Sequence, residues 1–157
     1  MKIHLIEPDH SQSASLSAKL RQQFVDVEVV EMANAREFLI LLATQSKFPD
    51  LVITEQRLPL IAPHEDALSH ITDLENYFPR VRSWDHTKAG EIIAQTVGET
   101  VGDFSRVPII IYSTKGFYDG IKDGSVCEVN PNAVYCEKLI KFDNLIAIIN
   151  AMQVFQI

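Results

Sequence analysis

Three short runs of consecutive apolar residues stand out along the chain, at positions 3–6, 51–53 and 107–112. The apolar residues occupy successive positions rather than alternating with polar ones. This pattern is typical of strands that are buried on both faces, as in a parallel sheet. Two weaker strand patterns cover residues 25–30 and 133–136. The sequence therefore predicts five strands.

Amphipathic helix patterns separate these runs. Apolar residues recur at helical spacing in the segments 11–24 and 138–155, and again in the segment that follows Asn34,. Asn34 is an expected N-cap, and Glu37 three residues later resembles the second residue of a capping box. Alternation of strands and helices predicts an α/β fold with an open five-stranded parallel sheet and helices on both faces.

The segment between the third and fourth predicted strands is longer than a crossover connection requires. It covers residues 60–107 and contains two helix patterns, over 63–78 and 87–97. One helix is the expected crossover, and the other is predicted to be an insertion at about residues 60–86 of a single domain that spans 1–157. We expect that deletion of residues 62–84 leaves a folded domain.

Three aromatic residues lie near the end of this insertion: Tyr77, Phe78 and Trp84. Exposed aromatic side chains are good anchors for a protein partner, so these residues are candidates for a partner surface. The alternative is a small satellite core beneath a long loop, in which the same side chains are packed.

Composition and charge narrow the choice of function. The chain has 157 residues, 21 acidic against 14 basic, and a net charge of −7. An acidic chain without a basic stripe is not expected to bind nucleic acid. No apolar run approaches the ~20 residues of a membrane span, so no membrane partner is expected. The two cysteines do not form a disulfide framework, which favours a cytoplasmic location,.

Residues with side chains that could bind a ligand or take part in a reaction follow the predicted strands. In chain order they are Glu7, Asp9, Glu55, Ser113 and Lys138, with the apolar Pro8 between the first two. Ligands of an open parallel sheet bind beyond the carboxyl ends of its strands. We therefore expect carboxylates, a hydroxyl and a lysine to converge at one edge of the sheet.

These segments resemble the receiver domain of bacterial two-component response regulators, the CheY-like fold. The resemblance covers residues 1–59 and 107–155. The stretch PDLVITEQRLP resembles the family's third-strand motif, VPIIIYST resembles its fourth strand, and VYCEK resembles its fifth. The resemblance implies that Ser113 is the phosphate-sensing hydroxyl, Lys138 the phosphate-pairing lysine and Tyr135 the rotating switch aromatic.

The sequence departs from the family at the chemical centre. Glu55 stands where the family has its phosphoacceptor aspartate, and Glu7 and Pro8 stand where it has its magnesium-binding acid pair. Pro8 offers no side-chain oxygen to Mg²⁺, and Glu55 is one methylene longer than aspartate. Asp9 is the alternative ligand if the chain bends at Pro8. The departures favour a pseudo-receiver without phosphotransfer, enzymatic activity or cofactor, in which Glu55 pairs with Lys138.

The expected output is protein–protein interaction, because the chain ends just after its last predicted helix. Expected partners are a histidine kinase or a downstream effector, and a homodimer through the last helix–strand–helix face, residues 115–155. Two alternatives stay open. One is a phosphoacceptor regulator that uses Asp9, Glu7 and either Asp50 or Glu55. The remote one is a small flavodoxin-like enzyme or flavin carrier, which the absence of a phosphate loop after the first strand disfavours.

Overall fold

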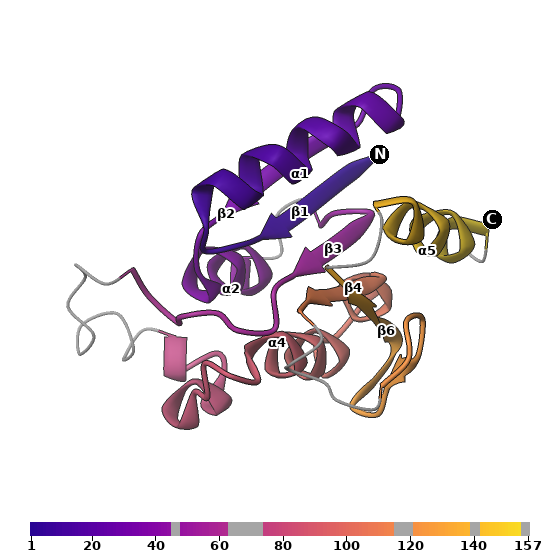
Figure 1. The fold of residues 1–157 in the computed structure, drawn as a ribbon. Helices are drawn as coiled ribbons and strands as arrows, with labels where there is room; N and C mark the ends of the chain where they lie inside the picture. The colour runs from indigo at the N-terminus through magenta and orange to yellow at the C-terminus, as the bar shows by residue number, and fades with distance from the viewer. Residues whose placement is uncertain (45–47, 63–73, 115–120, 139–141, 155–157) are drawn as a thin grey trace.

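The computed structural model describes residues 1–44, 48–62, 74–114, 121–138 and 142–154 (Figure 1). Its centre is a six-stranded sheet in the order β2-β1-β3-β4-β6-β5. The five parallel strands are β1 (Lys2–Ile6), β2 (Glu28–Met32), β3 (Leu51–Thr54), β4 (Ile109–Ser113) and β6 (Asn130–Glu137). The sixth, β5 (Val126–Cys127), is antiparallel to β6.

The open α/β sheet is as predicted, although the bounds and the number of its strands differ. The second strand begins at Glu28 rather than at Val25, because Asp26 has a left-handed φ of 56° and turns the chain there. The prediction of five strands is wrong by one, since β5 adds a short antiparallel strand at the edge. A strand of two residues has no periodicity that a sequence pattern could reveal.

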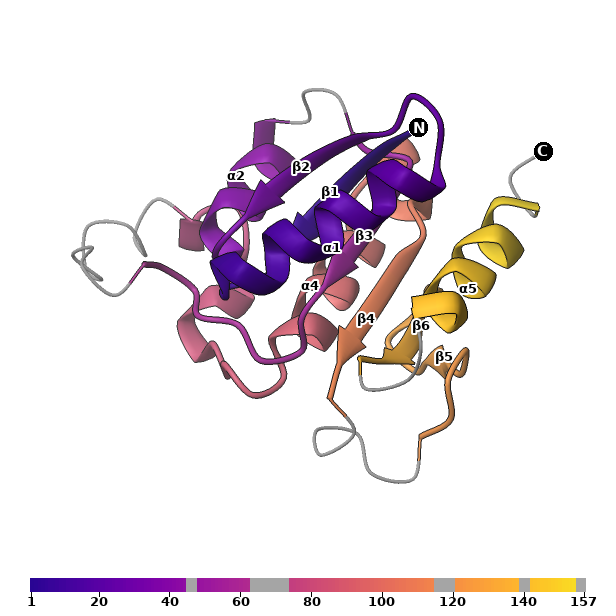
Figure 2. The same cartoon turned by 45° about the horizontal axis from the view of Figure 1, so that its top comes forward.

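The helices form a layer on each face of the sheet (Figure 2). Helices α1 (His10–Gln23) and α5 (Phe142–Val154) cover one face, and α2 (Ala35–Thr44) and α4 (Ala89–Gly98) cover the other. Two 3₁₀ turns, η1 (Pro79–Ser83) and η2 (Asp103–Arg106), flank α4. Each helix layer packs against the sheet and forms a separate hydrophobic cluster with it. No described helix has the length and apolar character that crossing a membrane requires.

The start of α2 is held as the sequence predicts. The Asn34 side chain accepts a hydrogen bond from the backbone N–H of Glu37 at 3.1 Å. The Glu37 carboxylate reaches back to the N–H of Ala33 at 2.9 Å, one residue before the expected partner. One of the free N–H groups at this helix end, that of Glu37, is thereby satisfied, together with the N–H of the preceding residue Ala33,.

The described end of the predicted insertion belongs to the core. The helix expected over 63–78 lies mostly outside the described residues, but Leu74 and Val81 are 4% and 3% exposed and join the cluster beneath α2 and α4. Phe78 and Trp84 pack against the same cluster, and the Trp84 indole donates to the carbonyl of Leu58 at 3.1 Å. These contacts contradict the expectation that residues 62–84 can be deleted without loss of the fold.

The three aromatic candidates for a partner surface therefore differ in exposure. Tyr77 is 67% exposed, whereas Phe78 and Trp84 are partly buried against the core. The Tyr77 and Phe78 rings lie 6.4 Å apart, centroid to centroid. Phe78 and Trp84 thus pack against the main core rather than forming a separate satellite core, and Tyr77 alone of the three presents most of its side chain to solvent.

The connection from β4 to β6 differs from the predicted helix–strand–helix face. Its described part, residues 121–129, contains turns and β5 and no helix. Gly124 N–H donates to the Tyr135 carbonyl at 2.7 Å, and Tyr135 N–H donates to the Ser125 carbonyl at 3.0 Å. The Asp123 carboxylate accepts from the N–H of Glu137 at 2.7 Å. The segment 123–127 therefore lines the outer edge of β6.

Candidate functional site

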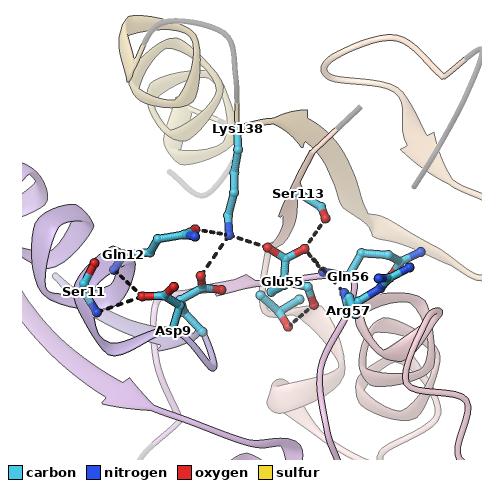
Figure 3. A network of polar contacts seen from close by, with 10 residues as sticks. Asp9, Ser11, Gln12, Glu55, Gln56, Arg57, Ser113 and Lys138 are labelled. Atoms are coloured by element: carbon cyan, nitrogen blue, oxygen red, sulfur yellow. Dashed lines mark hydrogen bonds and ion pairs between the residues drawn. The ribbon is translucent and has the colours of Figure 1, made fainter. Parts of the chain in front are cut away.

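The sheet register brings four of the predicted site residues together at its carboxyl edge. Backbone pairing continues one residue past the strands, since Glu55 N–H donates to the Ile6 carbonyl at 2.9 Å and Lys138 N–H to the Ser113 carbonyl at 2.8 Å. Figure 3 shows Lys138 reaching down towards Glu55, which faces Ser113 on the neighbouring strand end. The predicted convergence of carboxylates, hydroxyl and lysine is what the structure shows.

The Glu55 carboxylate is bonded through both of its oxygens. Oε1 accepts from the Ser113 hydroxyl and from the backbone N–H of Gln56, the latter at 2.8 Å. Oε2 accepts from the ammonium group of Lys138. The Glu55 side chain is only 10% exposed. The position expected to accept a phosphoryl group thus holds a carboxylate whose two oxygens already accept bonds from the same chain.

The Lys138 ammonium group is equally engaged. Besides Glu55 it donates to Glu7 Oε1 at 3.0 Å and to the side-chain oxygen of Gln12 at 2.9 Å. Lysine has three donor hydrogens, so each of them has an acceptor here. The side chain is 14% exposed, which gives these charge-assisted bonds a partly desolvated setting,.

Glu7 is the more deeply buried of the two acids, with 6% of its side chain exposed. Burial raises the pKa of this carboxyl, against the opposing effect of the Lys138 charge. Its second oxygen, Oε2, is buried without a hydrogen-bond partner among the described residues. A buried acceptor without a partner costs free energy, so this oxygen is an unusual feature of the edge.

Asp9 acts as the N-cap of α1. Its Oδ1 accepts from the backbone N–H groups of Ser11 at 2.9 Å and Gln12 at 3.0 Å (Figure 3). These bonds lower the pKa of the exposed Asp9 carboxyl, and the bond from the Gln12 N–H has the larger effect. These two capping hydrogen bonds explain why α1 begins shortly after the end of β1.

The donor set at this edge does not fit Mg²⁺. A magnesium site needs several oxygens in octahedral array. Pro8 supplies no side-chain oxygen, Asp9 caps a helix, and Glu55 is bonded to a serine and a lysine. In the described part of the chain, no three residues of the ligating types His, Cys, Asp and Glu gather closely enough to hold a metal ion.

Tyr135 lies inside the protein, 6% exposed. Its hydroxyl donates to Glu91 Oε1 in the first turn of α4 at 2.6 Å and lies 3.5 Å from Cys127 Sγ. Burial, followed by these contacts, raises the pKa of Tyr135. Glu91 could not be identified from the sequence, because it lies 44 residues away from Tyr135 and belongs to no local motif.

Gln56 connects Glu55 to α4. The Gln56 side-chain oxygen accepts from the Glu91 N–H at 3.0 Å, and its carbonyl accepts from the Gly90 N–H at 3.2 Å. A Cβ at position 90 would lie 2.7 Å from that side-chain oxygen and 3.1 Å from the Gln56 Cα, so a larger residue there would displace Gln56. Glu55, Gln56, Glu91, Tyr135 and Lys138 therefore form one continuous set of contacts across β3, α4 and β6.

Asp50, weighed as an alternative acid, lies at the opposite end of β3. It directly precedes the strand, and its carboxylate accepts from the Lys2 N–H at 2.7 Å. It therefore cannot act with Glu7 and Glu55, which follow their strands.

Comparison with known proteins places the fold. No family model and no curated protein matches the sequence. Solved receiver domains do match the structure. The receiver domain of sensor histidine kinase PA1611 from Pseudomonas aeruginosa, with magnesium coordinated in its cleft, aligns with a TM-score of 0.60 at 19% identity, covering 96% of this chain and 95% of that one.

Two further neighbours agree. The N-terminal domain of a response regulator/sensory box/GGDEF protein from Carboxydothermus hydrogenoformans aligns with a TM-score of 0.58 at 16% identity, covering 99% and 97% of the two chains. The receiver domain of the Francisella response regulator 1452 gives 0.53 at 14%, covering 99% and 98%. At these identities the likeness establishes the fold: the chain has the CheY-like fold of response-regulator receiver domains.

Proposed function

We propose that this receiver fold is a pseudo-receiver, a signalling protein that acts through protein–protein contacts without phosphorylation of its strand-end acid. The observation that carries the proposal is the bonding of Glu55 to both Ser113 and Lys138. In a working receiver, the hydroxyl and the lysine would instead contact the oxygens of a transferred phosphoryl group. Here those two donors are bonded to the acid itself.

The chemistry of phosphoryl transfer explains why this arrangement argues against turnover. Catalysis of that reaction rests on positioning and on neutralising charge with a metal ion and cationic groups. A nucleophilic oxygen of Glu55 would have to leave a charge-assisted bond in a buried setting. The extra methylene also extends the carboxylate towards Ser113 and Lys138, where the incoming group would lie.

The contacts of Tyr135 support a single signalling conformation. Its hydroxyl is held by Glu91, and Glu91 is tied through its backbone N–H to Gln56, the neighbour of Glu55. Rotation of Tyr135 outwards would leave the Glu91 carboxylate without this partner and expose a buried ring. The aromatic therefore stays inside without help from a phosphoryl group.

The proposed partner surface includes β5 and the turns that flank it in the described segment 121–129. Ile121, Val126 and Val129 are 38%, 58% and 43% exposed, a concentration of apolar side chains around a two-residue strand. The proposed partner is a histidine kinase or an effector protein, met in the cytoplasm. Two buried free thiols, Cys127 and Cys136, suit a reducing compartment,.

Incubation with acetyl phosphate and Mg²⁺, followed by measurement of acid-labile phosphate, tests the proposal. We expect no stoichiometric label on Glu55 or Asp9. The double variant Glu55→Asp, Pro8→Asp restores the shorter acid and a second carboxylate, and we expect it to acquire label. Stoichiometric phosphate on the unaltered chain would show that the edge is chemically competent and would refute the pseudo-receiver.

A further inference from the structure

The first turn of α4 takes its capping hydrogen bonds from another element. Lys88, which precedes the helix, offers no side-chain hydrogen bond to the free N–H groups. Gln56 supplies acceptors instead, since its carbonyl accepts from the Gly90 N–H at 3.2 Å and its side-chain oxygen accepts from the Glu91 N–H at 3.0 Å. The N–H groups of a first helical turn have no partner within the helix. Two of those in α4 therefore depend on a residue that follows β3.

The packing around Gln56 restricts how these two bonds can form. Gln56 is only 2% exposed. A Cβ on Gly90 would also lie 3.0 Å from Cγ2 of Ile111, so α4 approaches Gln56 and β4 as closely as a residue without a side chain allows. Tightly packed interiors change between discrete arrangements rather than deforming continuously. The start of α4 is therefore either capped by Gln56 or displaced from it.

The other end of Gln56 is held by the ion pair at the strand ends. Its backbone N–H donates to Glu55 Oε1 at 2.8 Å, and Glu55 Oε2 accepts from the ammonium group of Lys138 (Figure 3). The acid thus orients the peptide group before Gln56, and α4 holds the peptide group after it. A change in the bonding of the Glu55 carboxylate reaches α4 through this single residue.

The first turn of α4 also borders the proposed partner surface. Glu91 Oε1 accepts from the Tyr135 hydroxyl at 2.6 Å, and that hydroxyl lies 3.5 Å from Cys127 Sγ in β5. These three residues line a cavity of about 540 Å³. The exposed apolar residues of the proposed partner surface line the same cavity: Ile121, Val126 and Val129. Displacement of α4 would therefore change the surface that a partner meets.

We propose that Gln56 is a latch that couples the ion pair at the strand ends to the partner surface around β5. With Gln56 in place, the first turn of α4 holds Glu91 against Tyr135 and keeps Cys127 buried. When Gln56 is withdrawn, that turn loses two capping bonds and the contact with Tyr135 loosens. The inference rests on the proposed function, because it describes how the partner surface of the pseudo-receiver is regulated. By reciprocity, a partner that favours the displaced α4 also weakens the bond between Glu55 and Gln56.

Thiol labelling of the native protein measures this coupling. Both cysteines are buried, but Cys127 lies at the β5 end of the network, whereas Cys136 packs in the cluster on the α1–α5 side of the sheet. Burial raises the pKa of the Cys136 thiol to about 12, so this thiol reacts mainly after global unfolding,. Iodoacetamide labelling at about pH 8, followed by peptide mass spectrometry, gives both rates. The ratio of the Cys127 rate to the Cys136 rate reports local opening at β5 and corrects for global stability.

Variants of Gln56 test the latch itself. Gln56→Leu removes the side-chain acceptor at similar size, and we expect the rate ratio to rise about tenfold, as for the loss of one helix-capping acceptor. Gln56→Glu keeps an acceptor oxygen at the helix start and should stay within about twofold of the unaltered protein. Gln22→Leu makes the same change at an exposed position of α1 and should leave the ratio unchanged.

Gly90→Ala tests the latch from the α4 side. Alanine is the better helix former, so propensity alone predicts a firmer α4 and a lower rate ratio. Its Cβ would displace Gln56, so the latch predicts a higher ratio instead. The two explanations thus give opposite signs for this variant.

Glu55→Leu tests the connection to the ion pair. It removes the acceptor of the Gln56 N–H, while Lys138 keeps Glu7 and Gln12 as acceptors. We expect the rate ratio to rise about threefold in the otherwise unaltered chain and to rise no further in the Gln56→Leu background. The inference is overturned by additive effects in this cycle, by an unchanged ratio in Gln56→Leu, by equal ratios in Gln56→Leu and Gln56→Glu, or by a lower ratio in Gly90→Ala.

The phosphorylation assay is independent of these rates, so the two failures can be told apart. Stoichiometric phosphate on the unaltered chain removes the pseudo-receiver, and the rate ratios of the unphosphorylated protein still show whether Gln56 couples the two ends. Absence of phosphate together with an unchanged ratio in Gln56→Leu removes only the latch.

Discussion

Replacement of Lys138 by methionine tests the central ion-pair network most directly. Methionine keeps an unbranched apolar stem but removes the ammonium group that contacts Glu7 and Glu55. The two carboxylates are 6% and 10% exposed and would be left without their cation. Removing one partner from a buried ion pair typically costs about 3–5 kcal/mol, because a buried charge is then uncompensated.

That loss is large against the total stability of a domain, about 5–15 kcal/mol. Urea unfolding can be followed by the fluorescence of Trp84, the only tryptophan of the chain. We expect the free energy of unfolding to fall by about 3–5 kcal/mol at pH 7.5 in Lys138→Met. Lys122→Met, at an exposed lysine, should change it by no more than about 0.5 kcal/mol,.

The pH dependence identifies the cause of the loss. The pKa of Glu7 is already raised by burial, and removal of the Lys138 charge raises it further. A carboxyl whose folded-state pKa is raised stabilises the fold below its unfolded pKa and destabilises it as pH rises through the folded value. The deficit of Lys138→Met should therefore shrink as pH falls from 7.5 towards about 5.

A double variant measures the pair itself. Glu55→Gln in the Lys138→Met background should recover part of the lost stability, since one of the unpaired charges is gone. A loss below about 1 kcal/mol in Lys138→Met, or one independent of pH, would mean that the lysine contributes as an ordinary surface charge. Glu55 would then not be held in place by contacts within its own chain.

Three further outcomes are expected. Tyr135→Phe should lower the free energy of unfolding by about 1–2 kcal/mol in urea, whereas Tyr77→Phe should be neutral; equal effects would deny the hydroxyl contact to α4,. His4 is buried, and its pKa is lowered to about 4. The free energy of unfolding should therefore fall by about 1–3 kcal/mol as pH drops from 6.5 to 4. A His4→Leu variant that kept this loss would show that protonation of His4 is not its cause. Val126→Asp should reduce partner recovery by affinity purification from the native cell, with Val101→Asp unchanged; unimpaired recovery would exclude the surface around β5.

The sequence predicts the main strands and the position of the site because both follow from local rules. Continuous apolar runs such as Ile109–Ile111 are typical of strands in a sheet that helices cover on both faces,. In a parallel sheet the residues after each strand must meet at one edge, so the meeting of Glu55 with Lys138 could be anticipated without coordinates. The pairing needed only the strand order, which the resemblance supplied.

Contacts that depend on tertiary placement could not be read in this way. Glu91 looks like any acid in a first helical turn, and its bond to Tyr135 exists only because α4 packs across β4 and β6. The bond from Lys138 to the side-chain oxygen of Gln12 likewise has no signal in the sequence. Trp84 is equally able to anchor a partner or to pack, and only the nearby core settled that it packs.

The two outer strands of the sheet bear on how this protein avoids aggregation. An unpaired strand edge can recruit another chain into a growing sheet. At one side the segment 123–127 occupies the bonds of β6 and presents only the two residues of β5 as a new edge. At the other side β2 carries the exposed acids Glu28 and Glu31. Addition of a second chain to the sheet is thus opposed at one edge by the shortness of β5 and at the other edge by repulsion between like charges on β2.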